Sequence, residues 1–362
     1  MLYDASGGEI EISQMAERIQ SELSRPFHLH QHEVFVTLSI GIVHDVSNYS
    51  RPEEILRDAE IAMYRAKSGG RIRYEIFDAD MHRQLVAHVK MESDLRRALD
   101  RQEFLLHYQP IVSMLSGQIA GFEALIRWQS SDGRLVSPGD FIPLAEKTGL
   151  IVEMDLWSLE HACRQVGEWQ SAFQNSGADD PPLFISVNLS RKLLTLPDLV
   201  PRVREILQRT QFDASTLKLE ITESSIVENT QSAIEVLNGL KILGLQLSID
   251  DFGTGYSSLS YLHQFPLDVL KIDRSFINGM ETDEGKHKMV WTIIAMARNL
   301  GMVIVAEGVE LPEQVDLLEI LTCDYCQGFF FSKPLNSQDA QELLKSGKAW
   351  PSPSEAPALV RS

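Results

Sequence analysis

Acidic side chains recur along this chain at the ends of short apolar segments that have the length and composition of β-strands. Strand–helix units that repeat with an acid at one strand end after another predict a barrel whose site lies on one rim. So many carboxylates at one place would repel each other unless cations lie among them. The pattern therefore predicts divalent-metal chemistry on a phosphate ester. The residues concerned, one asparagine and one lysine among them, are Glu123, Asn188, Glu220, Glu223, Asp250, Asp251, Lys271, Asp273, Glu307 and Glu310.

Two of these acids, Asp250 and Asp251, are adjacent. Neighbouring side chains of a regular strand point to opposite faces. Both carboxylates can face one site only where the strand ends and turns, and residues 252–255 are expected to supply that turn. Lys271 lies between two apolar strand residues, Leu270 and Ile272, and is expected to point into the mouth of the barrel.

The elements that must position these residues begin after about residue 103. Eight strands with helices between most of them predict a (β/α)8 TIM-type barrel, which is an α/β fold. The first two strands are joined only by residues 113–117, a hairpin spacing, so one of them is expected to be antiparallel. The strands are expected at 103–112, 118–128, 183–189, 216–223, 245–251, 268–273, 302–307 and 325–331, with helices at 199–208, 230–243, 286–300 and 312–320.

The first 80 residues form a separate, small α+β unit in this interpretation. A helix at 10–23, an alternating strand through Val34, Val36, Leu38 and Ile40, a helix at 52–67 and a strand at 73–77 are expected. A further helix at 79–100 is either a rigid connector with a dimer seam or the first helix that packs on the barrel.

Composition limits the classes of partner. The chain has 362 residues, of which 44% are hydrophobic, as in ordinary globular proteins. Its net charge of -18 argues against DNA or RNA polymers, which need basic surface. The 3 cysteines do not make a disulfide framework. The sequence shows neither an apolar run of membrane-spanning length nor a signal-peptide pattern. A cytoplasmic location is therefore expected. Residues 347–362 are expected to form a disordered tail.

Seven sequence blocks follow one another in a fixed order between about residues 95 and 346. They are Gln109-Pro110-Ile111 with EALIRW, FISVNLS, LKLEITES, IDDFGTGYSSLSYL, LKIDRSFI, VAEGVE and QGFFFSKP. One block alone would be a weak signal, but the ordered set, each on an expected strand end, resembles the EAL-domain family of cyclic di-GMP phosphodiesterases.

The resemblance implies two divalent ions, Mg²⁺ or Mn²⁺, and cyclic di-GMP as the ligand. It implies that a water attacks the phosphorus and opens the ring to linear 5′-pGpG, with the two ions clamping the attacking and leaving oxygens. Lys271 would orient or activate this water or neutralise charge, and the sequence leaves these roles open. The implied ligands are Glu123, Asn188, Glu220 and Asp250 for one ion, and Asp250, Asp251 and Glu307 for the second.

Further roles follow from the same resemblance. Arg127 would contact a phosphate, and the amides of Gln109 and Gln327 would meet guanine or phosphate edges of the ligand. Asp273 shares a strand face with Lys271 and would support the second ion or the substrate. Glu223 would anchor the loop 252–262, and Glu310 would play a similar supporting part.

The blocks VTLSIGIV and AEIAMYRAKSGGR resemble the second half of a GGDEF domain, the diguanylate cyclase fold. The first half with its signature hairpin is absent, so cyclase activity is expected to be lost. The expected domains are a partial GGDEF-like unit at 1–80, a connecting helix at 81–100, the EAL barrel at 101–346 and the tail.

Two functions of different classes compete. The first is a hydrolase specific for cyclic di-GMP. The second is a catalytically silent cyclic di-GMP receptor regulated through the loop 252–262. Receptors of this fold lose metal ligands or the loop sequence, and this chain departs from the family pattern at none of these positions, which favours the enzyme. A homodimer through the barrel is expected from the resemblance alone.

Overall fold

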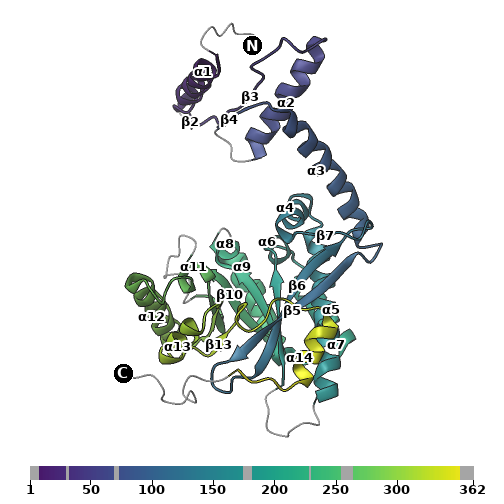
Figure 1. The fold of residues 1–362 in the computed structure, drawn as a ribbon, viewed down its shortest axis with the longest axis vertical. Coiled ribbons are helices and arrows are strands. Elements are labelled where there is room, and N and C mark those ends of the chain that lie inside the picture. Colours follow the sequence, from purple (N-terminus) through teal and green to yellow (C-terminus); the bar gives the residue numbers. More distant parts are fainter. Residues whose placement is uncertain are drawn as a thin grey trace. The chain divides into compact units, whose positions relative to one another are not determined.

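The computed structural model describes residues 8–29, 32–68, 73–173, 182–227, 230–253 and 264–350. The chain divides into two compact units, Met1–Asp94 and Leu95–Ser362 (Figure 1). Each unit is described by itself.

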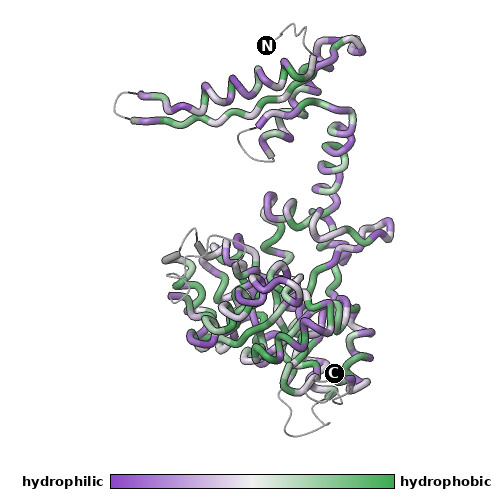
Figure 2. Tube along the Cα trace, turned by 60° about the vertical axis from the view of Figure 1, so that its left-hand side comes forward, coloured by the Kyte–Doolittle hydropathy of each residue, from purple (hydrophilic) through white to green (hydrophobic). Residues whose placement is uncertain are grey.

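The first unit contains α1 (Gly8–Leu23), a hairpin of β1 (Phe27–Leu29) and β2 (His32–Val34), and a parallel pair of β3 (Ser39–Ile42) and β4 (Arg73–Ile76) with α2 (Pro52–Ser68). Helix α2 begins with a proline and two glutamates and ends with basic residues, which suits the helix dipole. It packs closely on β3, because a Cβ at Gly41 would lie 2.0 Å from the Ala59 carbonyl oxygen. Figure 2 shows hydrophilic and hydrophobic residues interleaved along these elements.

The prediction of one alternating strand through Val34 and Ile40 was wrong. The structure has two strands there, β2 and β3, and residues 35–38 between them are not in a strand. Phe35 and Val36 are exposed, so no packed face extends the alternation across this segment. Helix α3 (Ala79–Ala98) follows β4 as predicted, and its last turn buries Leu95 and Ala98.

The second unit is a closed barrel of eight strands. Strand β5 pairs antiparallel with β6 and with β13, and every other neighbouring pair in the barrel is parallel. The prediction of one antiparallel strand at the start of the barrel is therefore confirmed. The strands are β5 (Phe104–Ser113), β6 (Ile119–Gln129), β8 (Phe184–Leu189), β9 (Leu217–Thr222), β10 (Gln246–Phe252), β11 (Val269–Ile272), β12 (Val303–Ala306) and β13 (Tyr325–Cys326), with β7 (Leu135–Val136) beside β6.

Helices cover the outside of the barrel (Figure 1). The space between helices and strands holds the main core, in which Tyr108 and Phe122 lie with their ring centres 4.9 Å and 5.2 Å from that of Trp169. The helices are α4 (Pro138–Thr148), α5 (Ile151–Phe173), α6 (Arg191–Leu194), α7 (Leu199–Thr210), α8 (Glu223–Val227), α9 (Thr230–Ile242), α11 (Arg274–Ile277), α12 (Glu284–Asn299), α13 (Pro312–Ile320) and α14 (Ser337–Lys345).

The amino-terminal end of the barrel interior is closed by side chains. Ile111, Phe184, Val269 and Val305 form a separate buried cluster, as expected for a barrel that is a packed core and not a pore. Lys218 lies among them with its ammonium 3.4 Å from the centre of the Phe184 ring. Because apolar side chains fill the amino-terminal end, the polar residues of the barrel gather at its carboxyl-terminal rim.

Two predictions near the carboxyl terminus need correction. The last strand was expected over 325–331, but β13 spans only two residues, because the chain turns at Gly328, where a Cβ would lie 2.1 Å from the Val309 carbonyl oxygen. Residues 347–350 were expected in the disordered tail, yet Trp350 is buried and its N–H donates to the Gly117 carbonyl at 2.9 Å. The rest of the expected tail, 351–362, lies outside the described residues.

Candidate active site

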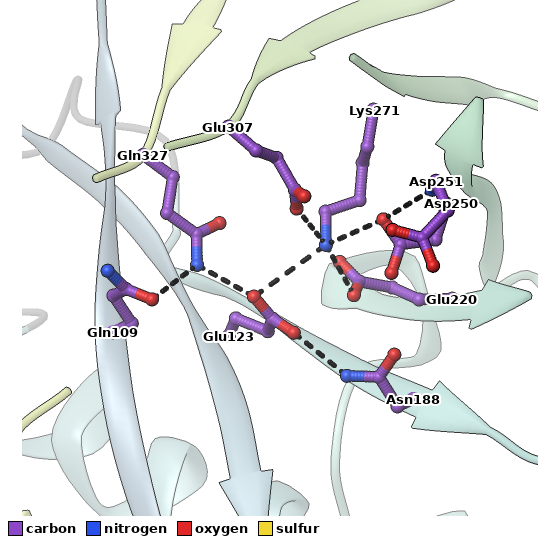
Figure 3. A network of polar contacts seen from close by, with 9 residues as sticks. All are labelled: Gln109, Glu123, Asn188, Glu220, Asp250, Asp251, Lys271, Glu307 and Gln327. Carbon is purple, nitrogen blue, oxygen red and sulfur yellow. Dashed lines mark hydrogen bonds and ion pairs between the residues drawn. The ribbon is translucent and has the colours of Figure 1, made fainter. Parts of the chain in front are cut away.

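Polar side chains from every strand of the barrel meet at its carboxyl-terminal rim (Figure 3). The strand register places these residues at the same height in the barrel. Asn188 on β8 pairs with Glu220 on β9 in parallel register, and Gln109 on β5 lies opposite Glu123 on β6 in antiparallel register. The remaining members are Asp250 and Asp251 on β10, Lys271 on β11, Glu307 just after β12 and Gln327 just after β13.

Lys271 is the centre of this cluster. Its side chain is 1% exposed, as the prediction that it points into the barrel requires. Its ammonium lies 2.5 Å from Glu307, 2.7 Å from Glu220, 3.4 Å from Asp250 and 3.6 Å from Glu123. One cation therefore bridges acids from four different strand ends.

The acids outnumber this cation, and their pKa values reflect it. Burial raises the pKa of Glu220 well above its usual value and that of Glu307 to about 8, with neighbouring carboxylates adding to the effect and Lys271 opposing it. Burial and then Asp250 raise the pKa of Asp251. Burial would also raise the pKa of Glu123, but Lys271 and hydrogen bonds from Gln327 and Asn188 outweigh it and lower that pKa. The cluster thus favours further positive charge.

Asp250, Asp251 and Glu307 offer oxygens that all lie within 4.8 Å of one another, a group that could hold a metal ion. The adjacent acids share one site through a bulge and not through a terminal turn, so the predicted cause was wrong. Strand β10 continues to Phe252, its register shifts between Ile249 and Phe252, and Asp251 has a φ of 54°. This left-handed residue turns the second carboxylate toward the first.

The amides at the rim form a chain. Gln327 donates from Nε2 to Glu123 at 2.7 Å and to the Gln109 oxygen at 3.1 Å, and Gln109 in turn donates to the Ser332 carbonyl at 3.2 Å. Asn188 donates to the other oxygen of Glu123 at 2.8 Å. The buried Oε1 of Gln327 has no hydrogen-bond partner within the described part of the chain. An acceptor left open on a side chain that also contacts Glu123 suits a hydrated cation.

Two further residues predicted to contact the substrate, Arg127 and Asp273, form hydrogen bonds with backbone groups outside this cluster. Arg127 is half-buried, donates to the Ile126 carbonyl at 2.9 Å, and has its pKa lowered by burial. Asp273 caps α11 by accepting from the Ser275 N–H at 3.0 Å, while its charge contributes to raising the pKa of Asp251.

Glu223 and Glu310 were both predicted to support loops. Glu223 is buried and accepts from the Gly253 N–H at 3.2 Å, directly after the bulge. Residues 254–262 of the loop assigned to it lie outside the described residues. Glu310 is exposed, and the structure shows its backbone N–H held by the side chain of Gln314 at 2.8 Å.

Comparison with known proteins identifies the family of this barrel. The family model of the EAL domain matches residues 92–334. The chain belongs to the EAL domain family. A second model, described as diguanylate cyclase, GGDEF domain, matches residues 1–73. Among the residues that the structure describes, no helix has the length and apolar character needed to cross a membrane.

Two relatives of this EAL chain are named as cyclic di-GMP phosphodiesterases. It is 40% identical over 332 residues to the bifunctional diguanylate cyclase/cyclic di-GMP phosphodiesterase MucR of Pseudomonas aeruginosa, covering 92% of this chain and 47% of the relative. It is 35% identical over 321 residues to the cyclic di-GMP phosphodiesterase PdeR of Escherichia coli, covering 89% and 47%. The chain thus spans about half the length of these relatives.

Solved EAL structures share the fold. The PaMucR phosphodiesterase in complex with c-di-GMP is 42% identical, with a TM-score of 0.65, and the match covers 69% of this chain and 99% of that one. The EAL enzyme Bd1971 in its cAMP-bound form is 30% identical with a TM-score of 0.68, over 83% and 77%.

Sequence reasoning missed two residues that support the EAL rim. Gln314 holds the loop after β12, and its signal was its place three residues past Leu311 at the start of a helix, where Glu or Gln commonly caps. Asp155 on α5 accepts from the Ser190 N–H at 2.9 Å, two residues after Asn188. No local pattern marked Asp155, because its partner is 35 residues away.

Proposed function

We propose that this chain hydrolyses cyclic di-GMP to linear 5′-pGpG with the help of two divalent metal ions, Mg²⁺ or Mn²⁺. The observation that carries the proposal is the Lys271 cluster, in which acids from four strand ends surround one buried ammonium. Its relatives' names and the c-di-GMP complex of a 42% identical barrel support the same substrate.

The residues present fit the ions. Glu123, Asn188, Glu220 and Asp250 would hold one, and Asp250, Asp251 and Glu307 the other; every donor is an oxygen, the type that hard cations prefer. When bound, the ions supply positive charge at the phosphate and lower the pKa of water. The raised pKa values of Glu220 and Glu307 and the open Gln327 oxygen are the features of this chain that call for such charge.

The chain's own groups then have defined tasks. Lys271 orients the attacking water and balances charge on the phosphate, and Arg127 with the amides of Gln109 and Gln327 binds the substrate. The water oxygen bonds to phosphorus, the bond from phosphorus to the 3′ oxygen breaks, and that oxygen takes up a proton. Asp273 supports the rim, and Glu223 anchors the loop that starts at Gly253.

We also propose the domain limits 1–80, 81–100 and 101–346 for the GGDEF-like part, the connecting helix and the EAL barrel. The matches to the two family models support this division, because the GGDEF match ends at residue 73, before the proposed connector, and the EAL match begins at residue 92, within it.

Turnover is tested directly. The chain is incubated with cyclic di-GMP and Mg²⁺ or Mn²⁺, with an EDTA control, and the nucleotides are separated by chromatography. Metal-dependent pGpG is expected. Binding without turnover would instead assign the chain to the receptor class.

The substitution Asp250→Asn tests the ligand set. It should reduce turnover by far more than the ~10–100-fold that loss of a supporting residue costs, because one shared ligand of both ions is removed. Asp132→Asn changes an exposed acid in a turn and should leave the rate unchanged. Near-normal turnover by the Asp250 variant would contradict the proposed ligand set.

A further inference from the structure

Gln314 uses both ends of its amide although it is 1% exposed. Its oxygen accepts from the N–H groups of Glu310 at 2.8 Å and Leu311 at 3.1 Å. Its nitrogen donates to the Ile277 carbonyl at 3.3 Å and to Glu281 Oε2 at 3.2 Å. Buried amides with four contacts of this kind hold their surroundings in one arrangement.

These contacts join two segments that carry the cluster. Glu310 lies three residues after Glu307, in the segment after β12. Ile277 is the last residue of α11, which begins three residues after Lys271 on β11. Gln314, which belongs to neither segment, therefore links the support of Glu307 to the support of Lys271.

The inner ends of the two segments are already in contact. The Glu307 N–H donates to the Ile272 carbonyl at 3.1 Å, and a Cβ at Gly308 would lie 2.3 Å from the Arg274 Cβ. The middle of the segment after β12 is held by backbone hydrogen bonds of Val309 with Gln327 and Phe330, both at 3.0 Å. The Gln314 amide fixes the outer end of the segment, at Glu310 and Leu311, to Ile277 and Glu281.

We propose that Gln314 is a positioning residue that holds Glu307 at the rim, 2.5 Å from Lys271, before a cation is bound. The need for such a tether is electrostatic. Glu307 lies with Asp250 and Asp251 in a group whose oxygens are within 4.8 Å of one another, and carboxylates so close repel. The inference rests on the proposed function, since it concerns the second ion's ligand set.

A capping role alone would explain half of these contacts. Gln314 accepts from Leu311 at the start of α13, as a residue in the third helical position often does. The substitution Gln314→Glu separates the two roles. Glutamate caps equally well, but it has no donor for Ile277 and its charge would face Glu281.

The experiment compares Gln314→Glu with wild type and with Gln338→Glu, the same change in the first turn of α14. Metal affinity is measured by the shift in melting temperature with Mg²⁺ concentration. Hydrogen exchange measures protection of the Glu307 amide, which donates to the Ile272 carbonyl where the two segments meet. We expect normal folding, faster exchange at the Glu307 amide and a ~10–100-fold weaker metal affinity for Gln314→Glu only. Adding Glu281→Gln should restore part of the affinity, because it returns a donor to this pair.

Wild-type metal affinity and wild-type protection in Gln314→Glu would overturn the inference, and Gln314 would then only cap the start of α13. These readouts need no turnover. If the wild-type chain binds Mg²⁺ but produces no pGpG, the proposed function fails, while the exchange and affinity measurements still decide the role of Gln314.

Discussion

At the scale of single residues, Lys271 compensates the charge of the acids that crowd the rim. A buried lysine is costly unless it is paired, and this one is paired with acids from four strand ends. Burial alone would lower its pKa, yet the surrounding carboxylates raise that pKa well above the usual value. The charged ammonium form is therefore favoured, and it partly neutralises the site.

Replacing Lys271 by methionine should expose this dependence. We expect Lys271→Met to lose turnover and, without metal, about 3–5 kcal/mol of stability, because buried carboxylates lose their partner. Divalent cations should recover much of that stability, so the gain in melting temperature on adding Mg²⁺ should exceed that of wild type.

Lys218→Met is the matched control. Lys218 is also a buried lysine inside the barrel, but it lies over Phe184 and makes no ion pair with any described residue. Burial lowers its pKa to about 8. Its loss should leave the response to Mg²⁺ unchanged, and an equal Mg²⁺ response in both variants would show that Lys271 does not stand in for a cation.

At the scale of elements, the bulge in β10 is what makes Asp250 and Asp251 a pair. The left-handed φ of 54° at Asp251 is tolerated by asparagine, whose short side chain suits that region, but not by β-branched residues. Asp251→Asn should therefore fold with nearly wild-type stability and bind metal more weakly. Thermal melts with and without Mg²⁺ measure both quantities.

Asp251→Val provides the contrast within the same element. It should lose about 1–2 kcal/mol of additional stability, because valine must adopt the left-handed conformation or force the bulge to rearrange. If the valine variant were as stable as the asparagine variant in the absence of metal, the bulge would not depend on this residue.

The same element shows what a sequence can and cannot predict. Alternation and apolar runs placed β9 and β11 within one or two residues of their observed bounds, and so placed Glu220 and Lys271 on the rim, because a strand's period fixes which face a residue takes. The bulge, the two-residue β13 and the Gln314 contacts were not predicted. The short β13 follows from the close approach of Gly328 to Val309, and the Gln314 nitrogen reaches Ile277 and Glu281, which lie 37 and 33 residues away. Local patterns carry no record of such approaches.

At the scale of the whole molecule, the stability of the barrel should depend on pH through a group outside the cluster. Asp155 on α5 is half-buried and bonds to the Ser190 N–H, which ties a helix of the outer layer to the turn after β8. Burial raises the pKa of Asp155 to about 7; the hydrogen bonds from Ser190 oppose this rise and Glu146 adds to it. The ionised form is therefore disfavoured in the folded state.

The direction of the pH effect follows from this shift. The folded pKa of about 7 lies above the ordinary value of 3.8 for an aspartate, so the folded chain keeps a proton that the unfolded chain releases between these values. Stability from this group is complete below about pH 4, falls as pH rises toward 7, and is then constant. Asp155→Asn removes the titration and retains an oxygen that can accept from Ser190. Relative to wild type, it should gain little at pH 5 and about 2 kcal/mol at pH 8.5, less than the full shift implies at ~1.4 kcal/mol per unit because the carboxyl is only half-buried. Urea unfolding of the whole chain at both pH values measures this difference in stability.

Asp132→Asn is the control, since hydrogen bonds from Ser130 and Arg134 lower the pKa of Asp132 to about 2, outside the pH range compared. A difference between Asp155→Asn and wild type that does not grow with pH would show that the Asp155 carboxyl is ionised without penalty in the folded barrel.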